Sequence, residues 1–120
     1  MSVNNVKRWL TFDCYDTLVR YTESKSATMT DLISVKGGTK DLVESAWSVF
    51  QSSERRLQTE DFLPLNQVLK KSLKFALNEI GFESTTTDED KMLSAVKDAD
   101  PFPEVNQVLS ELKQDYKIAI

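Results

Sequence analysis

Two short β-prone segments near the ends of the chain restrict its fold more than any other feature. Residues 6–12 (VKRWLTF) and residues 116–120 (YKIAI) are apolar and typical of strands, whereas the residues between them follow helical spacing. Strands that are joined through helices usually pair in parallel, so an α/β fold with a parallel sheet is expected. Two strands leave such a sheet incomplete. We therefore expect these 120 residues to be the first half of a longer chain.

Helical patterning fills the chain between the two strands. Thr22, Thr39 and Thr87 are typical N-cap residues, and Thr87 opens a sequence that resembles a capping box. Gly37-Gly38 and Gly81 stand where helices are expected to end. Apolar residues at helical spacing predict the buried faces, namely Ala27, Leu32 and Ile33; Val43, Ala46, Trp47, Phe50 and Leu57; Leu65, Val68, Leu69, Leu73, Ala76, Leu77 and Ile80; Met92, Leu93 and Val96; and Val105, Val108, Leu109 and Leu112.

A proline-rich junction at residues 98–103 (DADPFP) separates the helical stretch from the last helix and strand. Pro103 is expected in the first turn of that last helix. The chain then divides into three parts. Residues 1–18 form the first strand and an acidic loop, residues 19–97 form a helical insertion, and residues 98–120 form the return helix and the start of the second strand.

The composition leaves carboxylates, hydroxyls, amines and one thiol as chemical groups. Histidine is absent from the 120 residues, which excludes Ser-His-Asp catalysis, Cys-His catalysis and His-ligated metals within them. Cys14 is the single cysteine, so disulfide frameworks and cysteine-rich metal sites are excluded too. With 15 Lys and Arg against 19 Asp and Glu, the net charge of −4 argues against nucleic acid or an anionic membrane as partner.

The N-terminal segment lacks the features of a signal peptide, because its apolar part is short and no small-residue cleavage site follows. No apolar run approaches the roughly 18 residues of a membrane span. A cytoplasmic protein with a reduced Cys14 is therefore expected.

One loop carries the candidate chemistry. Asp13 follows directly on the first predicted strand, and ligands of open α/β sheets bind at the carboxyl ends of strands. An aspartate in that place can act as a nucleophile, forming an ester or acyl phosphate that water then cleaves. The alternative is an aspartate that forms a turn or caps a helix, as most loop aspartates do.

Residues 12–18 (FDCYDTL) resemble the first motif of the haloacid dehalogenase superfamily, Asp-x-Asp-x-Thr after a buried strand. The pattern Phe-Asp-x-Tyr-x-Thr-Leu is more similar to the type II L-2-haloacid dehalogenases, in which tyrosine takes the third place. Residues 19–97 resemble the helical cap of the family in length and character, and residues 101–120 resemble its return to the core. The resemblance implies a Rossmann-like core, partial here, with an inserted helical cap.

The resemblance also implies roles for the loop residues. Asp13 would be the nucleophile and Thr17 would hold the loop in shape, while Cys14 and Tyr15 would contact the substrate. The substrate would be a small 2-haloacid, and neither a metal nor another cofactor would be needed. The remaining motifs of the family would follow Ile120, so the 120-residue chain alone is expected to be inactive.

Tyr15 favours dehalogenation on chemical grounds. A phosphatase of this kind needs an acid two residues after the nucleophile to protonate the leaving alkoxide, and tyrosine, with an ordinary pKa of about 10, serves poorly. Halide leaves without a proton. Two alternatives stay open: a phosphatase of the same superfamily that acts on a small metabolite, and a truncated chain that binds a partner without catalysis. A homodimer is compatible with the sequence, which does not decide the oligomeric state.

The chain departs from the family pattern at several positions. Asp16 and Arg20 stand where the family commonly has other residues, and Arg55 and Arg56 lie about two helical turns late for the arginine that holds the halogen in dehalogenases. Arg55-Arg56 and the lysines at 70, 71 and 74 are interpreted as solvated helix faces. The aromatic residues that could line a pocket, but are more typical of a core, are Trp47, Phe50, Phe62, Phe75 and Phe82.

Overall fold

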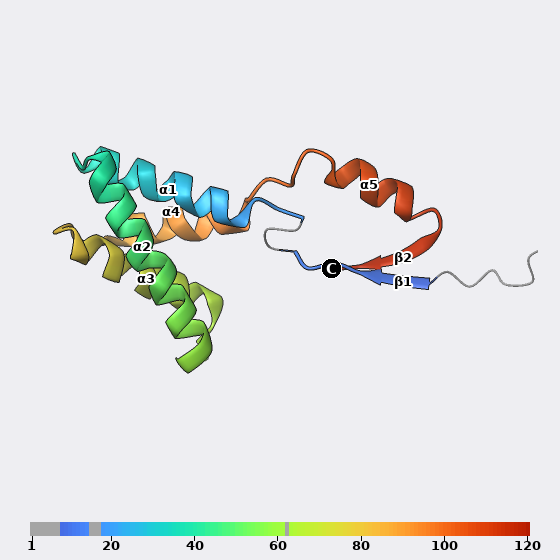
Figure 1. Ribbon diagram of the computed structural model, residues 1–120, viewed down its shortest axis with the longest axis horizontal. Coiled ribbons are helices and arrows are strands. Elements are labelled where there is room, and N and C mark those ends of the chain that lie inside the picture. Colours follow the sequence, from blue (N-terminus) through green and yellow to red (C-terminus); the bar gives the residue numbers. More distant parts are fainter. Residues whose placement is uncertain (1–7, 15–17, 62) are drawn as a thin grey trace, which may run out of the picture. The chain divides into compact units, whose positions relative to one another are not determined.

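A computed structural model describes residues 8–14, 18–61 and 63–120 (Figure 1). The elements follow in the order β1 (Arg8–Thr11), α1 (Tyr21–Val35), α2 (Lys40–Arg56), the π-helical segment η1 (Leu57–Asp61), α3 (Leu65–Glu79), α4 (Thr86–Lys97), α5 (Val105–Leu112) and β2 (Tyr116–Ala119). Among these described residues, no helix combines the length and the apolar character that a membrane crossing requires.

The chain forms two compact units. The helical unit is Glu23–Asp98 and holds η1, α2–α4 and nearly all of α1. The sheet unit combines Met1–Thr22 with Ala99–Ile120 and holds β1, α5 and β2. The boundaries of the units along the chain fall at 22/23 and 98/99; the sequence analysis divided the chain at 18/19 and 97/98.

The sheet unit is built on a parallel pair of strands. The register runs from Arg8 opposite Tyr116 to Thr11 opposite Ala119, and the Phe12 N–H extends the pairing with a 3.0 Å hydrogen bond to the Ala119 carbonyl. Helix α5 precedes β2 and contacts it, as a crossover helix does (Figure 1). The predicted parallel pairing is confirmed.

The outgoing and returning chain pair with each other just beyond the sheet. An antiparallel bridge joins Val19 and Pro101, and the Arg20 N–H donates a 2.7 Å hydrogen bond to the Asp100 carbonyl. The Arg20 guanidinium lies 5.8 Å from the centre of the Phe102 ring, within reach of a cation–π interaction. These contacts hold the two chain segments of the sheet unit together where the helical insertion begins and ends.

The helical unit has its own apolar core. Its buried apolar side chains are Met29, Leu32, Ile33, Ala46, Phe50, Leu57, Val68, Leu69, Leu73, Ala76, Leu77, Met92 and Val96. Most belong to the predicted faces. Ala27 is an exception, because it is exposed while Met29 is fully buried. Met29, Leu32 and Ile33 share one face at helical spacing, and position 27 lies on the opposite side of the helix from position 29.

Glycine ends two of the helices, as predicted. Gly37 has a φ of +84° and Gly81 a φ of +85°, the left-handed conformation that favours glycine after a helix. Their N–H groups donate to the Ser34 and Asn78 carbonyls at 3.0 and 3.1 Å. The predicted cap at Thr39 is also confirmed, because its side chain accepts from the N–H of the third following residue.

The structure corrects two predicted N-caps. Helix α1 begins at Tyr21, so Thr22 lies in its first turn rather than capping it. Thr85, not Thr87, caps α4: its hydroxyl accepts from the Asp88 N–H at 3.1 Å, and the Asp88 carboxylate accepts from the Thr85 N–H at 3.0 Å. A capping box needs an acidic residue three positions after the cap, and Asp88 meets that spacing from Thr85.

The predicted burial of α5 is wrong for the described residues. No residue of α5 is buried, and Val108 is 43% exposed. The reason is that, within the described part of the chain, the sheet beside this helix has two strands, of which the helix contacts β2. Pro103 lies in the turn before the helix, where Glu104 takes the N-cap position, so it is not in the first helical turn.

Candidate active site

Strand β1 carries Asp13 to the carboxyl edge of the parallel pair. Asp13 comes two residues after the last residue of the strand, and its side chain is exposed. Because β1 and β2 run in parallel, their carboxyl ends meet at the same edge. Ligands of α/β sheets bind at this edge, and the exposed Asp13 side chain follows β1 there; its role as a site residue stays a prediction.

One carbonyl connects the described segments on either side of residues 15–17. The Cys14 carbonyl accepts hydrogen bonds from the N–H groups of Leu18 at 2.9 Å and Val19 at 3.2 Å. Leu18 is buried, and its own carbonyl accepts from the Phe102 N–H at 3.1 Å. The segment that carries Asp13 is thus anchored by the strand on one side and by the returning chain on the other.

The structure does not describe every predicted site residue. Tyr15, Asp16 and Thr17 lie outside the described residues, so the roles given to Tyr15 and Thr17 stay predictions. Cys14 is half-buried with a free thiol, and its proposed contact with substrate through its N–H stays a prediction too. The part played by the Cys14 carbonyl was missed from sequence, because a backbone acceptor leaves no mark on residue type.

Metal ligands do not gather in the part of the chain that the structure describes. There, no group of three or more Asp, Glu or Cys side chains is arranged to hold a metal ion. Asp16, the second carboxylate of the loop, is outside the described ranges. The absence of a metal requirement therefore stays a prediction.

The described aromatic and arginine candidates lie in the helical core or on helix surfaces. Phe50 is fully buried, and Trp47 stacks on it at 5.6 Å between ring centres, which is a core arrangement. Phe75 is 42% exposed and lies 5.4 Å from the Arg56 guanidinium. Arg55 and Arg56 are both exposed, which confirms a solvated helix face. Phe62 is outside the described residues.

A buried ion pair in the helical unit was not predicted. The Lys25 ammonium lies 2.7 and 2.8 Å from the two carboxylate oxygens of Glu54, and the two side chains are 5% and 10% exposed. Lys25 also lies 5.7 Å from the centre of the Phe50 ring. Lysine and glutamate are common on exposed helix faces, so no sequence signal marks this pair as buried.

The fold is shared with solved structures of haloacid-dehalogenase type. One is YfnB from Bacillus subtilis, described as a hydrolase of this type bound to magnesium: TM-score 0.70, 19% identity, 93% of this chain and 50% of that chain covered. Another is L-2-haloacid dehalogenase from Xanthobacter autotrophicus. Its TM-score is 0.68 and its sequence identity 22%, and the match covers 96% of this chain and 46% of that chain. A third is a defluorinating L-2-haloacid dehalogenase. Its TM-score is 0.69 and its sequence identity 20%, and the match covers 93% of this chain and 49% of that chain.

These likenesses confirm the predicted fold class. The chain is an α/β protein whose helices and small parallel sheet match haloacid-dehalogenase structures. It spans about half the length of the solved structures that it matches. No sequence profile of a known protein family matches the chain, and no curated protein sequence matches it.

Proposed function

We propose that this chain belongs to a hydrolase of haloacid-dehalogenase type in which Asp13 is the nucleophile. The observation that carries the proposal is the exposed Asp13 carboxylate just past β1, at the carboxyl edge of a parallel strand pair. The hydrogen bonds that the Leu18 and Val19 N–H groups donate to the Cys14 carbonyl support it, because an anchored nucleophile needs little reorganisation during attack. The shared fold supports it further.

The proposed reaction is hydrolytic dehalogenation of a small 2-haloacid. An Asp13 carboxylate oxygen attacks the carbon that bears the halogen. The new C–O bond forms as the carbon–halogen bond breaks, and halide leaves with the bonding electrons. Water then attacks the carboxyl carbon of the Asp13 ester, which releases a 2-hydroxy acid of inverted configuration and one proton and regenerates the carboxylate. Thr17 would hold the loop, and Cys14 and Tyr15 would contact the substrate.

Two observations favour a haloacid over other substrates. Tyr15 stands in the motif where a phosphatase needs an acid, and halide needs no proton to leave. L-2-haloacid dehalogenases are also among the solved structures with the same fold. In the proposed reaction the substrate is a small molecule, and no metal takes part.

A phosphatase acting on a small metabolite is the second candidate. The magnesium-bound form of YfnB, a protein with the same fold, favours it. Asp13 would then attack phosphorus, with magnesium balancing the charge of the phosphoryl oxygens. If the dehalogenase proposal is right, EDTA leaves turnover of a 2-haloacid by the full-length protein unchanged. Phosphate release that EDTA abolishes and magnesium restores would establish the phosphatase instead.

A single turnover in H₂¹⁸O tests the role of Asp13. If Asp13 is the nucleophile, the first product carries an oxygen from the Asp13 side chain, and ¹⁸O appears in the Asp13 peptide by mass spectrometry. If Asp13 were a general base, water would attack the substrate directly. The first product would then contain ¹⁸O and the Asp13 peptide would stay unlabelled.

Substitution complements the labelling. Asp13→Asn should lower kcat of the full-length protein by about 10⁴-fold or more, the range seen when a catalytic nucleophile is removed. Asp100→Asn is the matched control, because Asp100 is also an exposed aspartate of the sheet unit. Its backbone carbonyl accepts the hydrogen bond from the Arg20 N–H, and the substitution leaves that carbonyl in place. Its kcat should stay within about twofold of the parent. Full activity of Asp13→Asn would refute the nucleophilic role.

A further inference from the structure

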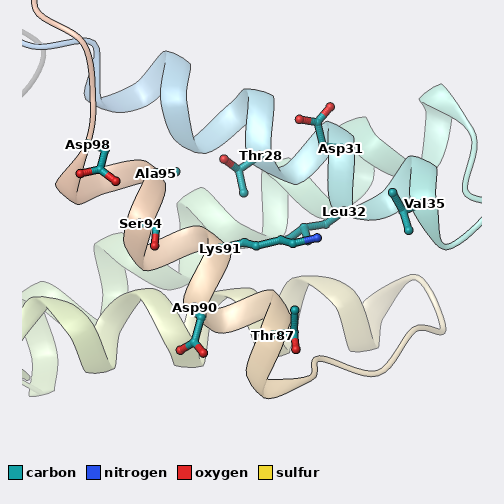
Figure 2. Close-up of a pocket in the computed structure, with 10 residues that line it drawn as sticks. All are labelled: Thr28, Asp31, Leu32, Val35, Thr87, Asp90, Lys91, Ser94, Ala95 and Asp98. Carbon is teal, nitrogen blue, oxygen red and sulfur yellow. The ribbon is translucent and has the colours of Figure 1, made fainter.

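A groove of about 620 Å³ runs between α1 and α4 within the helical unit (Figure 2). The residues that line it recur at helical spacing on both elements. They are Thr28, Asp31, Leu32 and Val35 on α1, and Thr87, Asp90, Lys91, Ser94, Ala95 and, just past the helix, Asp98 on the α4 side. The groove therefore lies between two helix faces, and all of its lining belongs to one unit.

The two helices run in opposite directions along the groove. Figure 2 shows Val35 and Thr87 toward one end of the groove, and Thr28 and Asp98 toward the other. The ion pair between the Lys36 ammonium and the Asp88 carboxylate, 2.9 Å long, ties the helices together at the Val35 end. From Thr87 to Asp98 the groove extends over roughly 16 Å at the rise of an α-helix, which is about three helical turns.

The surface of the groove is mainly apolar, with an acidic border. Leu32 and Ala95 contribute to the apolar part, and Val35 is 83% exposed, the highest value among the large apolar residues that the structure describes as exposed. Three aspartates and one lysine provide the charges of the lining. Asp31 and Asp90 have no ion-pair partner among the described residues, so their negative charge is available to a ligand.

We propose that the α1–α4 groove binds one cationic amphipathic α-helix of a partner protein. Three turns of such a helix match the length of the groove, and its apolar residues, spaced three and four apart, pack against the accessible side chains of Val35 and Ala95, above the buried Leu32. Lysine or arginine residues beside that stripe meet Asp31 and Asp90. The charge of the lining selects a cationic helix over an acidic one. The Lys91 side chain extends from α4 toward Leu32 (Figure 2), so a bound helix has to displace it.

Two synthetic peptides provide the probe. Both are fluorescently labelled amphipathic 14-residue helices with the same leucine stripe; one carries lysines on its polar face and the other glutamates. Binding to the full-length protein is measured by fluorescence anisotropy at about 150 mM salt, where long-range attraction is screened. The lysine peptide is expected to bind at least about tenfold more tightly than the glutamate peptide. Equal affinities, or no binding of the lysine peptide, would overturn the proposal.

Charge reversal locates the binding surface. The double variant Asp31→Lys, Asp90→Lys should weaken the lysine peptide by at least about tenfold. Glu44→Lys, an exposed acidic residue on α2 outside the groove, is the control and should change affinity less than about twofold. Equal weakening by both variants would mean non-specific attraction to an acidic protein and would refute the groove.

Amide chemical shifts provide a measurement that does not depend on a variant folding. Addition of the lysine peptide to the isotope-labelled parent protein should shift the resonances of Leu32, Val35 and Ala95. Shifts confined to other surfaces would overturn the assignment of this groove. Shifts centred on the loop that contains Asp13 would place the peptide at the proposed active site instead, which separates this inference from the proposed function.

Discussion

The two units of the chain differ sharply in how much of their apolar surface they bury. In the helical unit, α1–α4 enclose side chains such as Phe50 and Leu73 completely. In the described residues of the sheet unit, Leu18 and Tyr21 are the buried apolar side chains, and α5 contributes none. Burial of apolar surface is the main stabilising term in folding, so the helical unit carries most of the stability that these residues can supply.

The proposed nucleophile lies in the unit that buries less. Asp13 is held by hydrogen bonds of the backbone, from the strand pair and the Cys14 carbonyl, rather than by a packed core. Backbone anchoring leaves the side chain accessible, which a nucleophile requires. Regions with few buried contacts are also those that open most easily, so the two units are expected to differ in hydrogen-exchange protection.

The largest stability effect is expected at the buried ion pair of the helical unit. Glu54→Leu removes the carboxylate from the buried ion pair with the Lys25 ammonium, and it should lower the free energy of unfolding by about 3–5 kcal/mol. The double variant Lys25→Met, Glu54→Leu should recover most of that loss. Glu111→Gln, at an exposed hydrogen bond in the sheet unit, should change stability by less than about 0.5 kcal/mol. Chemical denaturation of the full-length variants measures all three changes in stability. A loss for Glu54→Leu no larger than that for Glu111→Gln would contradict the difference in stability between the helical unit and the sheet unit.

Truncation of apolar side chains tests the difference in burial directly. Leu73→Ala removes a fully buried side chain from α3 and should cost about 2–5 kcal/mol. Val108→Ala, at a position of α5 that is 43% exposed, should cost less than about 1 kcal/mol in the same denaturation experiment. Equal losses would show that α5 is covered in the full-length protein, and the contrast between the units would then not hold there.

Ser72→Ala should stabilise the helical unit. The Ser72 hydroxyl is fully buried on α3 and has no hydrogen-bond partner among the described residues, so its removal relieves a desolvation cost of about 1 kcal/mol. Alanine also favours helix, and Ser52→Ala controls for this, because the Ser52 hydroxyl on α2 is exposed and donates to the Ser48 carbonyl at 2.9 Å. A rise in melting temperature no greater than that of Ser52→Ala would refute the explanation.

The smallest effect is a pH dependence at the start of α4. Burial acts to raise the pKa of the Asp88 carboxyl, but hydrogen bonds from Thr85 and from the Lys36 ammonium outweigh burial and lower the pKa below its usual value. The ionised form is thus favoured in the folded state. The stabilisation is present above the unfolded-state pKa of about 3.9 and is lost as pH falls through the lower folded-state pKa.

Asp88→Asn removes this dependence. Its loss of stability relative to the parent should be constant near neutral pH and should shrink as pH falls below about 4. Urea denaturation of both proteins over a pH series measures the difference. A difference that stays constant down to the acid limit, or that grows there, would contradict a lowered pKa at Asp88.

The order of helices and strands could be predicted from the sequence because residues near the helix ends determine where the helices begin and end. Gly37 and Gly81 end helices through a backbone conformation that other residues resist, and Thr39 caps α2 through its own hydroxyl. Apolar spacing predicted most of the helical core. The position of Asp13 after a predicted strand, together with the pattern of the loop, was sufficient to predict the fold and the candidate nucleophile.

Features that depend on distant segments were not predictable in this way. Three features arise from how helix and sheet faces pack in space: the burial of Lys25 against Glu54, the absence of buried residues on the described α5, and the groove between α1 and α4. The types of the residues do not indicate which faces pack together. The same holds for the Cys14 carbonyl, which any residue could supply. Caps and turns are determined by neighbours in the chain, whereas burial and grooves depend on packing between elements far apart in sequence.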